Sequence, residues 1–153
     1  MQIGLRRGSF RPLKSPDELT EVFRARGLKV TPQRQAVFRA LHRNQVHPSA
    51  EAVYAEVAHD MPTISLRTVY QTLGDLAEMG EILQLELGTG AARFDPNIDP
   101  HHHLVCERCG LVRDVVVEQA EIRPTVTPEN EGFRIIGTEI VFRGLCADCA
   151  QAT

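Results

Sequence analysis

The four cysteines of the chain form two Cys-x-x-Cys pairs. Cys106 and Cys109 make the first pair and Cys146 and Cys149 the second, with residues 110–145, 36 in number, between them. Two residues between thiolates let one turn present both sulfurs to a tetrahedral metal, and two such turns complete a four-cysteine zinc site. Four thiolates leave no open coordination position. We therefore predict a structural Zn(II) that ties two distant segments together.

Two other interpretations of the cysteines stay open, a redox dithiol and incidental buried thiols. The basic N-terminus, Met1 to Lys14, lacks the apolar stretch of a signal peptide, and no apolar run approaches the ~18 residues of a membrane span. We expect a cytoplasmic protein with reduced thiols and no membrane partner.

The net charge of −3 hides a difference between the two ends of the chain. Residues 1–43 carry ten Lys and Arg against three Asp and Glu, which is +7, whereas residues 91–153 carry six against ten, which is −4. A basic N-terminal third suits a polyanion and an acidic C-terminal part suits cations, although a solvated charged face is the plainer explanation of either.

Four helices are predicted in the N-terminal half from their capping residues. The expected starts are the capping box Ser15 to Glu18, Thr31 followed by Pro32, Ser49, and a position near Ser65, with ends near Gly27 and Gly80. In the last helix we expect Tyr70 at the edge of the buried stripe and Thr72 facing outward. Alternating residues over 82–87 and 91–94, with glycines between, predict a β-hairpin. Helices closed by such a hairpin make a winged helix-turn-helix.

The two prolines in residues 95–100 predict a hinge, because they continue neither a helix nor a strand. Beyond it, residues 111–118 and 133–142 are predicted strands, and Pro124 and Pro128 allow only a short or kinked helix between them. The predicted fold class is α+β, with a winged-helix DNA-binding domain over residues 1–94. A C-terminal α/β dimerisation and metal-binding domain, with the four-cysteine zinc site, would follow over residues 95–153.

Histidines and aspartates next to the first cysteine pair suggest a second metal site. If residues 101–103 form a strand, His101 and His103 share one face and His102 points away. Asp95 precedes them and Asp114 follows on the next strand. For His102 we favour an ordinary surface role, as for the isolated His42 and His59.

Several motifs together resemble the ferric uptake regulator (Fur) family over roughly residues 17–150. They are Leu28-Lys29-Val30-Thr31-Pro32-Gln33-Arg34, His47-Pro48-Ser49-Ala50-Glu51, Ser65-Leu66-Arg67-Thr68-Val69-Tyr70 and the run from His101 to Gly110. The resemblance implies a winged helix followed by a dimerisation domain, in agreement with the patterns above.

The peroxide-sensing PerR branch of that family is the most similar. The resemblance implies a regulatory Fe(II) or Mn(II) held by His47, Asp95, His101, His103 and Asp114. Iron-sensing members usually carry Glu at the position of Asp95. Some relatives build a further metal site with a histidine where Thr138 stands, and no histidine follows His103 here, so we expect that site to be absent or weak.

The implied function is that of a metal-dependent transcriptional repressor, not an enzyme. A homodimer would bind a palindromic double-stranded operator, with Arg67, Thr68, Tyr70 and Gln71 as the candidate contacts. Arg6, Arg7, Arg11 and Lys14 would reach the phosphate backbone or the minor groove of the DNA. Peroxide would act through Fe(II)-catalysed oxidation of a ligand histidine. An iron-responsive Fur repressor of metal uptake is the nearest alternative. A non-haem iron enzyme and a thiol switch are the other candidates.

Overall fold

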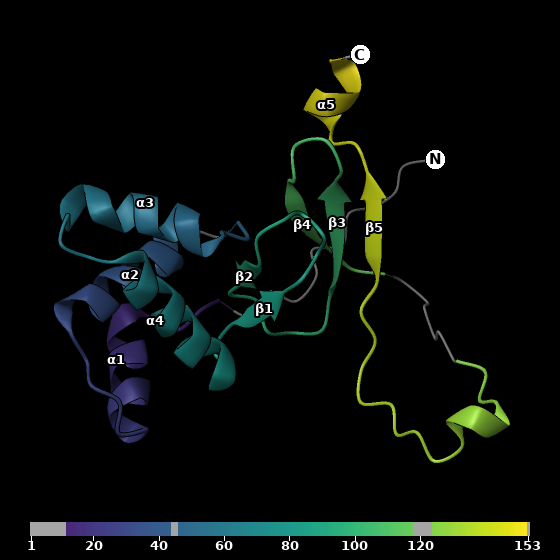
Figure 1. Cartoon of the computed structure of the whole chain (residues 1–153), viewed down its shortest axis with the longest axis horizontal. Helices are drawn as coiled ribbons and strands as arrows, with labels where there is room; N and C mark the ends of the chain where they lie inside the picture. The colour runs from purple at the N-terminus through teal and green to yellow at the C-terminus, as the bar shows by residue number, and fades with distance from the viewer. Residues whose placement is uncertain (1–11, 44–45, 118–123, 153) are drawn as a thin grey trace. The chain divides into compact units, whose positions relative to one another are not determined.

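The structure of the protein is a computed structural model that describes residues 12–43, 46–117 and 124–152. The chain divides between Asp99 and Pro100 into two units. The first contains α1 (Pro16–Ala25), α2 (Pro32–Arg43), α3 (Ala50–Asp60), α4 (Leu66–Glu78), β1 (Leu83–Leu85) and β2 (Arg93–Asp95) (Figure 1). The second contains β3 (His102–Cys106), β4 (Val112–Val115), the 3-10 helix η1 (Pro128–Asn130), β5 (Val141–Gly144) and α5 (Ala147–Gln151). The predicted α+β class, with helices and a hairpin before a second sheet, is confirmed.

Side-chain caps fix where the helices of the first unit begin. Ser15 and Glu18 form the predicted capping box of α1. The hydroxyl of Thr31 accepts a hydrogen bond from the backbone N–H of Arg34 at the start of α2. Ser49 and Ser65 cap α3 and α4 in the same way. These bonds satisfy N–H groups that the first turn of a helix leaves without backbone partners.

The core of the first unit lies among its four helices. Phe23 and Phe38 pack edge to face with ring centroids 4.9 Å apart, and α4 contributes Val69, Leu73 and Leu76. One expectation for α4 was wrong, because Thr72 is fully buried. Tyr70, expected at the edge of the buried stripe, is exposed. Thr72 can be buried because its hydroxyl donates to the backbone oxygen of Thr68 at 2.7 Å, which leaves no polar atom unsatisfied.

A short antiparallel hairpin follows α4. Its paired residues run from Leu83 opposite Asp95 to Leu85 opposite Arg93, fewer than the two predicted strands contain. The predicted domain boundary lies between Phe94 and Asp95, whereas the chain divides after Asp99. The difference arises because Asp95 is the last residue of β2 and is paired with Leu83.

The second unit is built on a three-stranded mixed sheet in the order β4-β3-β5. β3 pairs antiparallel with β4 and parallel with β5. The predicted strand over 133–142 was wrong in extent, because strand β5 covers only Val141–Gly144. β3 has only five residues. Four of them pair with β5, from His103 opposite Val141 to Cys106 opposite Gly144, so β5 has only four paired residues. Strand β4 covers Val112–Val115, fewer residues than the described part of the predicted strand 111–118, whose last residue lies outside the described residues.

No helix in the described part of the chain is long and apolar enough to cross a membrane.

Candidate metal centres and DNA interface

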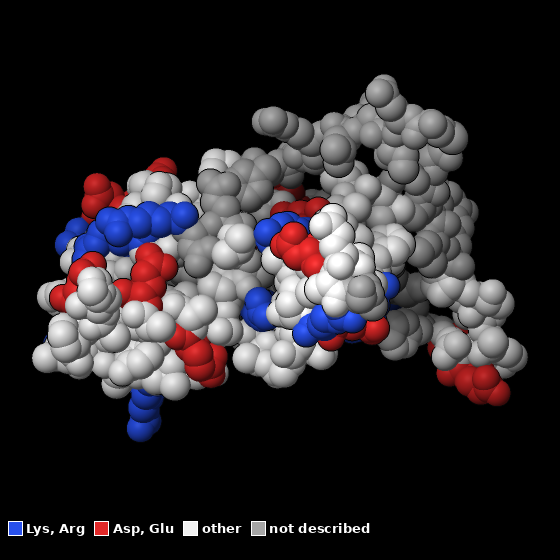
Figure 2. All heavy atoms as spheres, turned by 90° about the horizontal axis from the view of Figure 1, so that it is seen from above, with Lys and Arg blue, Asp and Glu red and all other residues white. Residues whose placement is uncertain are grey.

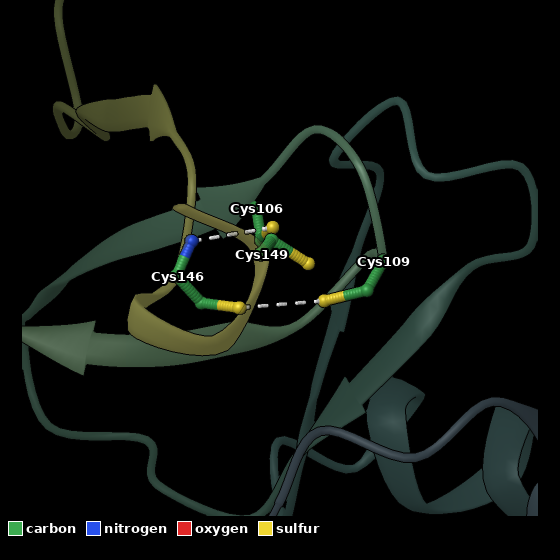
Figure 3. Close-up of side chains that lie close together, drawn as sticks. All are labelled: Cys106, Cys109, Cys146 and Cys149. Carbon is green, nitrogen blue, oxygen red and sulfur yellow. Dashed lines mark hydrogen bonds between the residues drawn. The ribbon is translucent and has the colours of Figure 1, made fainter. Parts of the chain in front are cut away.

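The four cysteines converge at one end of the sheet in the second unit, and their sulfurs point toward one another (Figure 3). All four Sγ atoms lie within 4.8 Å of one another, and those of Cys109 and Cys146 are 3.7 Å apart. Tetrahedral zinc with Zn–S bonds of about 2.3 Å places its sulfurs about 3.8 Å apart. The cluster therefore fits the predicted zinc site, and the cysteines are free thiols rather than disulfides.

The local backbone places these sulfurs. Cys106 ends β3, and a turn closed by the Gly110 N–H on the Cys106 carbonyl, with Gly110 at φ 72°, brings Cys109 back beside it. Cys146 is the N-cap of α5, and Cys149 lies in that short helix. Parallel pairing of β5 with β3 therefore carries the second pair to the first.

Backbone N–H groups also change the pKa of the Cys106 thiol. The amides of Cys109 and Cys146 donate toward the sulfur of Cys106 and lower its pKa to about 6. The neighbouring thiol of Cys146 raises the pKa of Cys149 to about 12. Zinc binds thiolates, so the amides around Cys106 favour the form of this ligand that the metal needs.

In the first unit, His47 and Asp95 lie side by side. His47 Nε2 is 3.0 Å from Asp95 Oδ2, and both residues are buried. Two hydrogen bonds hold the loop before α3 against β2: Arg93 donates to the His47 carbonyl at 3.0 Å, and the Phe94 N–H donates to the Pro48 carbonyl at 2.9 Å. Two ligands at right angles, each about 2.1 Å from a metal, are about 3.0 Å apart, so this pair has the spacing of adjacent metal ligands.

The other oxygen of Asp95 has its own partner. Oδ1 accepts the backbone N–H of Asn97 at 2.8 Å, and Asn97 Oδ1 in turn accepts the N–H of Asp99 at 3.2 Å. These turns hold the Asp95 carboxylate in one orientation, with one oxygen on the backbone and the other beside His47.

In the second unit, His101, His103 and Asp114 form another group. His101 Nε2 and His103 Nε2 lie 3.3 and 3.9 Å from Asp114 Oδ1, and the two rings meet edge to face with centroids 4.6 Å apart. Both distances fall between the roughly 3.0 and 4.2 Å expected for adjacent and opposite ligands about 2.1 Å from a metal. Pairing of His103 with Asp114 across β3 and β4 explains the placement.

One residue of this neighbourhood was missed by sequence reasoning. Glu139 Oε1 lies 3.1 Å from His103 Nδ1, on the opposite side of the ring from Nε2. Glu139 follows Thr138, in the segment that we predicted as part of a long strand, and no spacing motif links it to His103. His102 faces elsewhere, because its Nδ1 accepts the backbone N–H of Ile140 at 3.2 Å.

The candidate DNA contacts lie on α4. Arg67, Tyr70 and Gln71 are exposed, whereas Thr68 is half-buried and its hydroxyl is 2.9 Å from that of the N-cap, Ser65. Over the described residues on the face in Figure 2, basic and acidic side chains are interspersed on the first unit. Lys14 binds Glu81 instead of standing free, and Arg6, Arg7 and Arg11 lie outside the described residues.

Comparison with known proteins matches residues 25–143 to the model of the "Ferric uptake regulator family". The peroxide-responsive repressor PerR of Staphylococcus saprophyticus is 32% identical over 133 residues, which cover 87% of this chain and 89% of that protein. The ferric uptake regulator of Helicobacter pylori, described with three functional metal-binding sites, has a similar fold with a TM-score of 0.69 at 21% identity. That match covers 92% of this chain and 97% of the other.

A second solved structure, the ferric uptake regulator of Pseudomonas aeruginosa with manganese, is 27% identical with a TM-score of 0.62 and covers 84% of this chain and 97% of its own. The family model covers more than half of the chain, and the PerR relative is similar over most of its length. The chain belongs to the ferric uptake regulator family.

Proposed function

We propose that the protein is a homodimeric transcriptional repressor that binds DNA when a regulatory metal is present and senses peroxide through that metal. The observation that carries this proposal is the contact between the buried side chains of His47 and Asp95. The residue in contact with the histidine is an aspartate, where iron-sensing members usually carry a glutamate. The PerR relative supports the peroxide branch, since its name describes a peroxide-responsive repressor.

The regulatory metal would be held by His47, Asp95, His101, His103 and Asp114. Three imidazoles and two carboxylates suit Fe(II), Mn(II) or Zn(II), and the absence of thiolates from this set disfavours Cu(I). The manganese in the Pseudomonas aeruginosa relative agrees with such a donor set. A separate Zn(II) on Cys106, Cys109, Cys146 and Cys149 would be structural, because four thiolates fill a tetrahedral shell.

The division of these ligands between two units explains how a metal would control DNA binding. His47 and Asp95 belong to the first unit and the other three ligands to the second. An ion bound by both groups favours the arrangement of the units in which all five ligands can reach it. A ligand shifts a conformational equilibrium only through such a difference in affinity. We infer that the metal-bound arrangement is the one that binds the operator.

Exposed apolar side chains in the second unit support a homodimer. Phe133 and Ile136 are 78% and 95% exposed, and Leu104, Phe142 and Leu145 are each more than 40% exposed. Leu104 and Phe142 are neighbours across β3 and β5. Exposed apolar patches often mark protein interfaces, and a second copy of the chain would cover these side chains. Such a dimer would place two α4 helices on successive half-sites of a palindrome.

At the metal, Fe(II) would supply the chemistry that turns peroxide into an oxidant of nearby side chains. The ligand imidazoles would lie next to it, and the resemblance to the PerR branch makes His47 and His101 the proposed targets among them. The zinc-bound thiolates would be protected by their closed shell. The second candidate function is an iron-responsive repressor, which the similarity to the ferric uptake regulator of Pseudomonas aeruginosa favours.

DNA binding of the zinc-loaded dimer with and without Mn(II) tests the common part of both candidates. A duplex selected from random sequences by the Mn(II) form should bind far more weakly when Mn(II) is left out, and binding should weaken steeply with salt. Equal affinity in the two conditions would exclude a metal-gated repressor.

A further inference from the structure

The exposed ring of Tyr70 on α4 is tied to α3 by its hydroxyl. Tyr70 donates to Glu51 Oε1 at 2.5 Å, the short distance of a hydrogen bond to a charged acceptor. Tyr70 is 42% exposed, and Glu51 lies in the first turn of α3. A phenol has a single hydrogen to donate, so the bond commits the only donor of this side chain.

Glu51 and Tyr70 lie on two helices that are both capped and packed in the core. α3 and α4 are capped by Ser49 and Ser65, and their buried faces pack in the same core through Val53 and Leu73. Each partner also changes the acidity of the other: the phenol lowers the pKa of Glu51, and the carboxylate raises the pKa of Tyr70. At neutral pH the Glu51 carboxylate is therefore ionised and the Tyr70 phenol is neutral. This hydrogen bond needs such a charged acceptor and a neutral donor.

We propose that Glu51 is a specificity-determining residue, which binds the Tyr70 hydroxyl so that the tyrosine offers DNA its ring and an acceptor oxygen but no donor. This inference rests on the proposed DNA-binding function. It concerns how α4 distinguishes one operator sequence from another, and it does not depend on which metal controls DNA binding.

The chemistry of the base edges gives the consequence. A free phenol can donate to guanine N7 and O6, to thymine O4 or to a phosphate, and so adds affinity with little selectivity. The tethered phenol can only accept, which suits the amino groups of adenine and cytosine, while its ring can pack on a thymine methyl group. The Glu51 carboxylate also repels phosphates, which penalises misplaced docking.

The first test uses the protein alone. In a Tyr54→Phe background Tyr70 is the only tyrosine of the chain, because the sequence contains two. Its ultraviolet titration should show a phenol pKa that falls on Glu51→Ala. Glu56→Ala, which removes another exposed carboxylate of α3, should leave that pKa unchanged. If Glu51→Ala leaves the titration of this background unchanged, the bond does not form in solution and the proposal is overturned.

The second test measures selectivity on DNA. The probe is the duplex that the wild-type Mn(II) form selects, compared with single base-pair variants and with versions carrying uracil for thymine. Glu51→Ala should reduce discrimination among them by roughly fivefold, the size of effect typical of a single hydrogen bond. Adding Tyr70→Phe to Glu51→Ala should restore part of it, because phenylalanine has no donor.

Glu51→Gln separates tethering from charge. The amide oxygen of glutamine still accepts the phenol hydrogen, so discrimination should stay near the wild-type value while affinity rises for all duplexes. Equal loss of discrimination in Glu51→Gln and Glu51→Ala would mean that only the charge matters and would overturn the proposal. Failure of every variant and of the wild type to bind DNA would instead contradict the proposed function, while leaving the titration result intact.

Discussion

His47 Nε2 and Asp95 Oδ2 lie 3.0 Å apart although 48 positions separate the two residues in the chain. The loop before α3 and the end of β2 meet there because Arg93 and Phe94 bond to the backbone of residues 47 and 48. The first unit thus presents a nitrogen and an oxygen ligand as a preformed pair. Preformed ligands lose little conformational entropy when an ion binds.

We predict that His47→Ala removes the regulatory metal but not the zinc. One of five donors is lost, and it is one of the two that the first unit supplies, so the ion should no longer couple the units. Metal content after dialysis should show about one zinc per chain and no manganese, and the dependence of DNA binding on Mn(II) should disappear. His59→Ala, an exposed histidine near the end of α3, is the matched control and should behave as wild type.

Glu139 is expected to position His103 for metal binding. Its carboxylate accepts from Nδ1 and thereby leaves Nε2 as the metal-binding nitrogen. Loss of such a partner typically lowers metal affinity 10- to 100-fold. Because half of the Glu139 side chain is exposed, we expect the lower end, about tenfold, for Mn(II) binding to Glu139→Ala.

Calorimetric titration of the zinc-loaded protein with Mn(II) measures this effect. Glu139→Gln should lie between Glu139→Ala and wild type, since the amide oxygen can still accept the Nδ1 hydrogen. Glu131→Ala, an exposed carboxylate in the same unit, controls for the change in net charge. An unchanged affinity in Glu139→Ala would assign this glutamate no part in the metal site.

The zinc prediction concerns folding of the second unit. The cysteine cluster joins β3 to α5. Apart from it, the buried apolar residues in the described part of this unit are few, mainly Val105 and Val112. Structural zinc sites can contribute on the order of 10 kcal/mol to folding. Cys109→Ser and Cys149→Ser should therefore lose zinc and the dimer together, as measured by metal analysis and sedimentation. Glu107→Gln, inside the same turn, should keep both, and a metal-free wild type that stays a folded dimer would refute the structural role.

The sequence predicts best where a local rule decides the structure. Caps such as Ser15 and Thr31, and the Cys-x-x-Cys pairs, each depend on a few neighbouring residues, so their patterns could be interpreted directly. The contact of His103 with Asp114 followed from strand alternation together with family resemblance.

Features set by tertiary partners could not be predicted in this way. The extent of β5 depends on the length of β3, and Thr72 is buried because a backbone oxygen satisfies its hydroxyl. Glu139 meets His103 only through the path of the chain that leads into β5, so no sequence periodicity reveals the pair. The bond from the Tyr70 hydroxyl to Glu51 likewise joins two helices, and no sequence periodicity reveals it.

The last prediction separates peroxide sensing from iron sensing at the proposed regulatory metal site, of which Asp95 is one ligand. Fe(II) protein treated with micromolar peroxide should gain the mass of one oxygen atom on His47 or His101 and lose operator binding, whereas the Mn(II) protein should do neither. Peptide mass mapping and DNA binding on the same samples measure both, and the four cysteines should stay unmodified because a closed zinc shell protects them. Unmodified histidines with intact DNA binding would favour the iron-responsive alternative.

Asp95→Glu sharpens the test. Asp95 bonds the Asn97 N–H with one oxygen while the other lies beside His47. One added methylene, about 1.5 Å of extra reach, breaks this two-residue turn and frees the carboxylate to bind in other orientations. The charge is kept, so Mn(II)-dependent repression should persist, while histidine oxidation in the Fe(II) form should fall several-fold. Equal oxidation of the wild-type protein and the Asp95→Glu variant would show that the orientation of this carboxylate does not determine the reaction with peroxide.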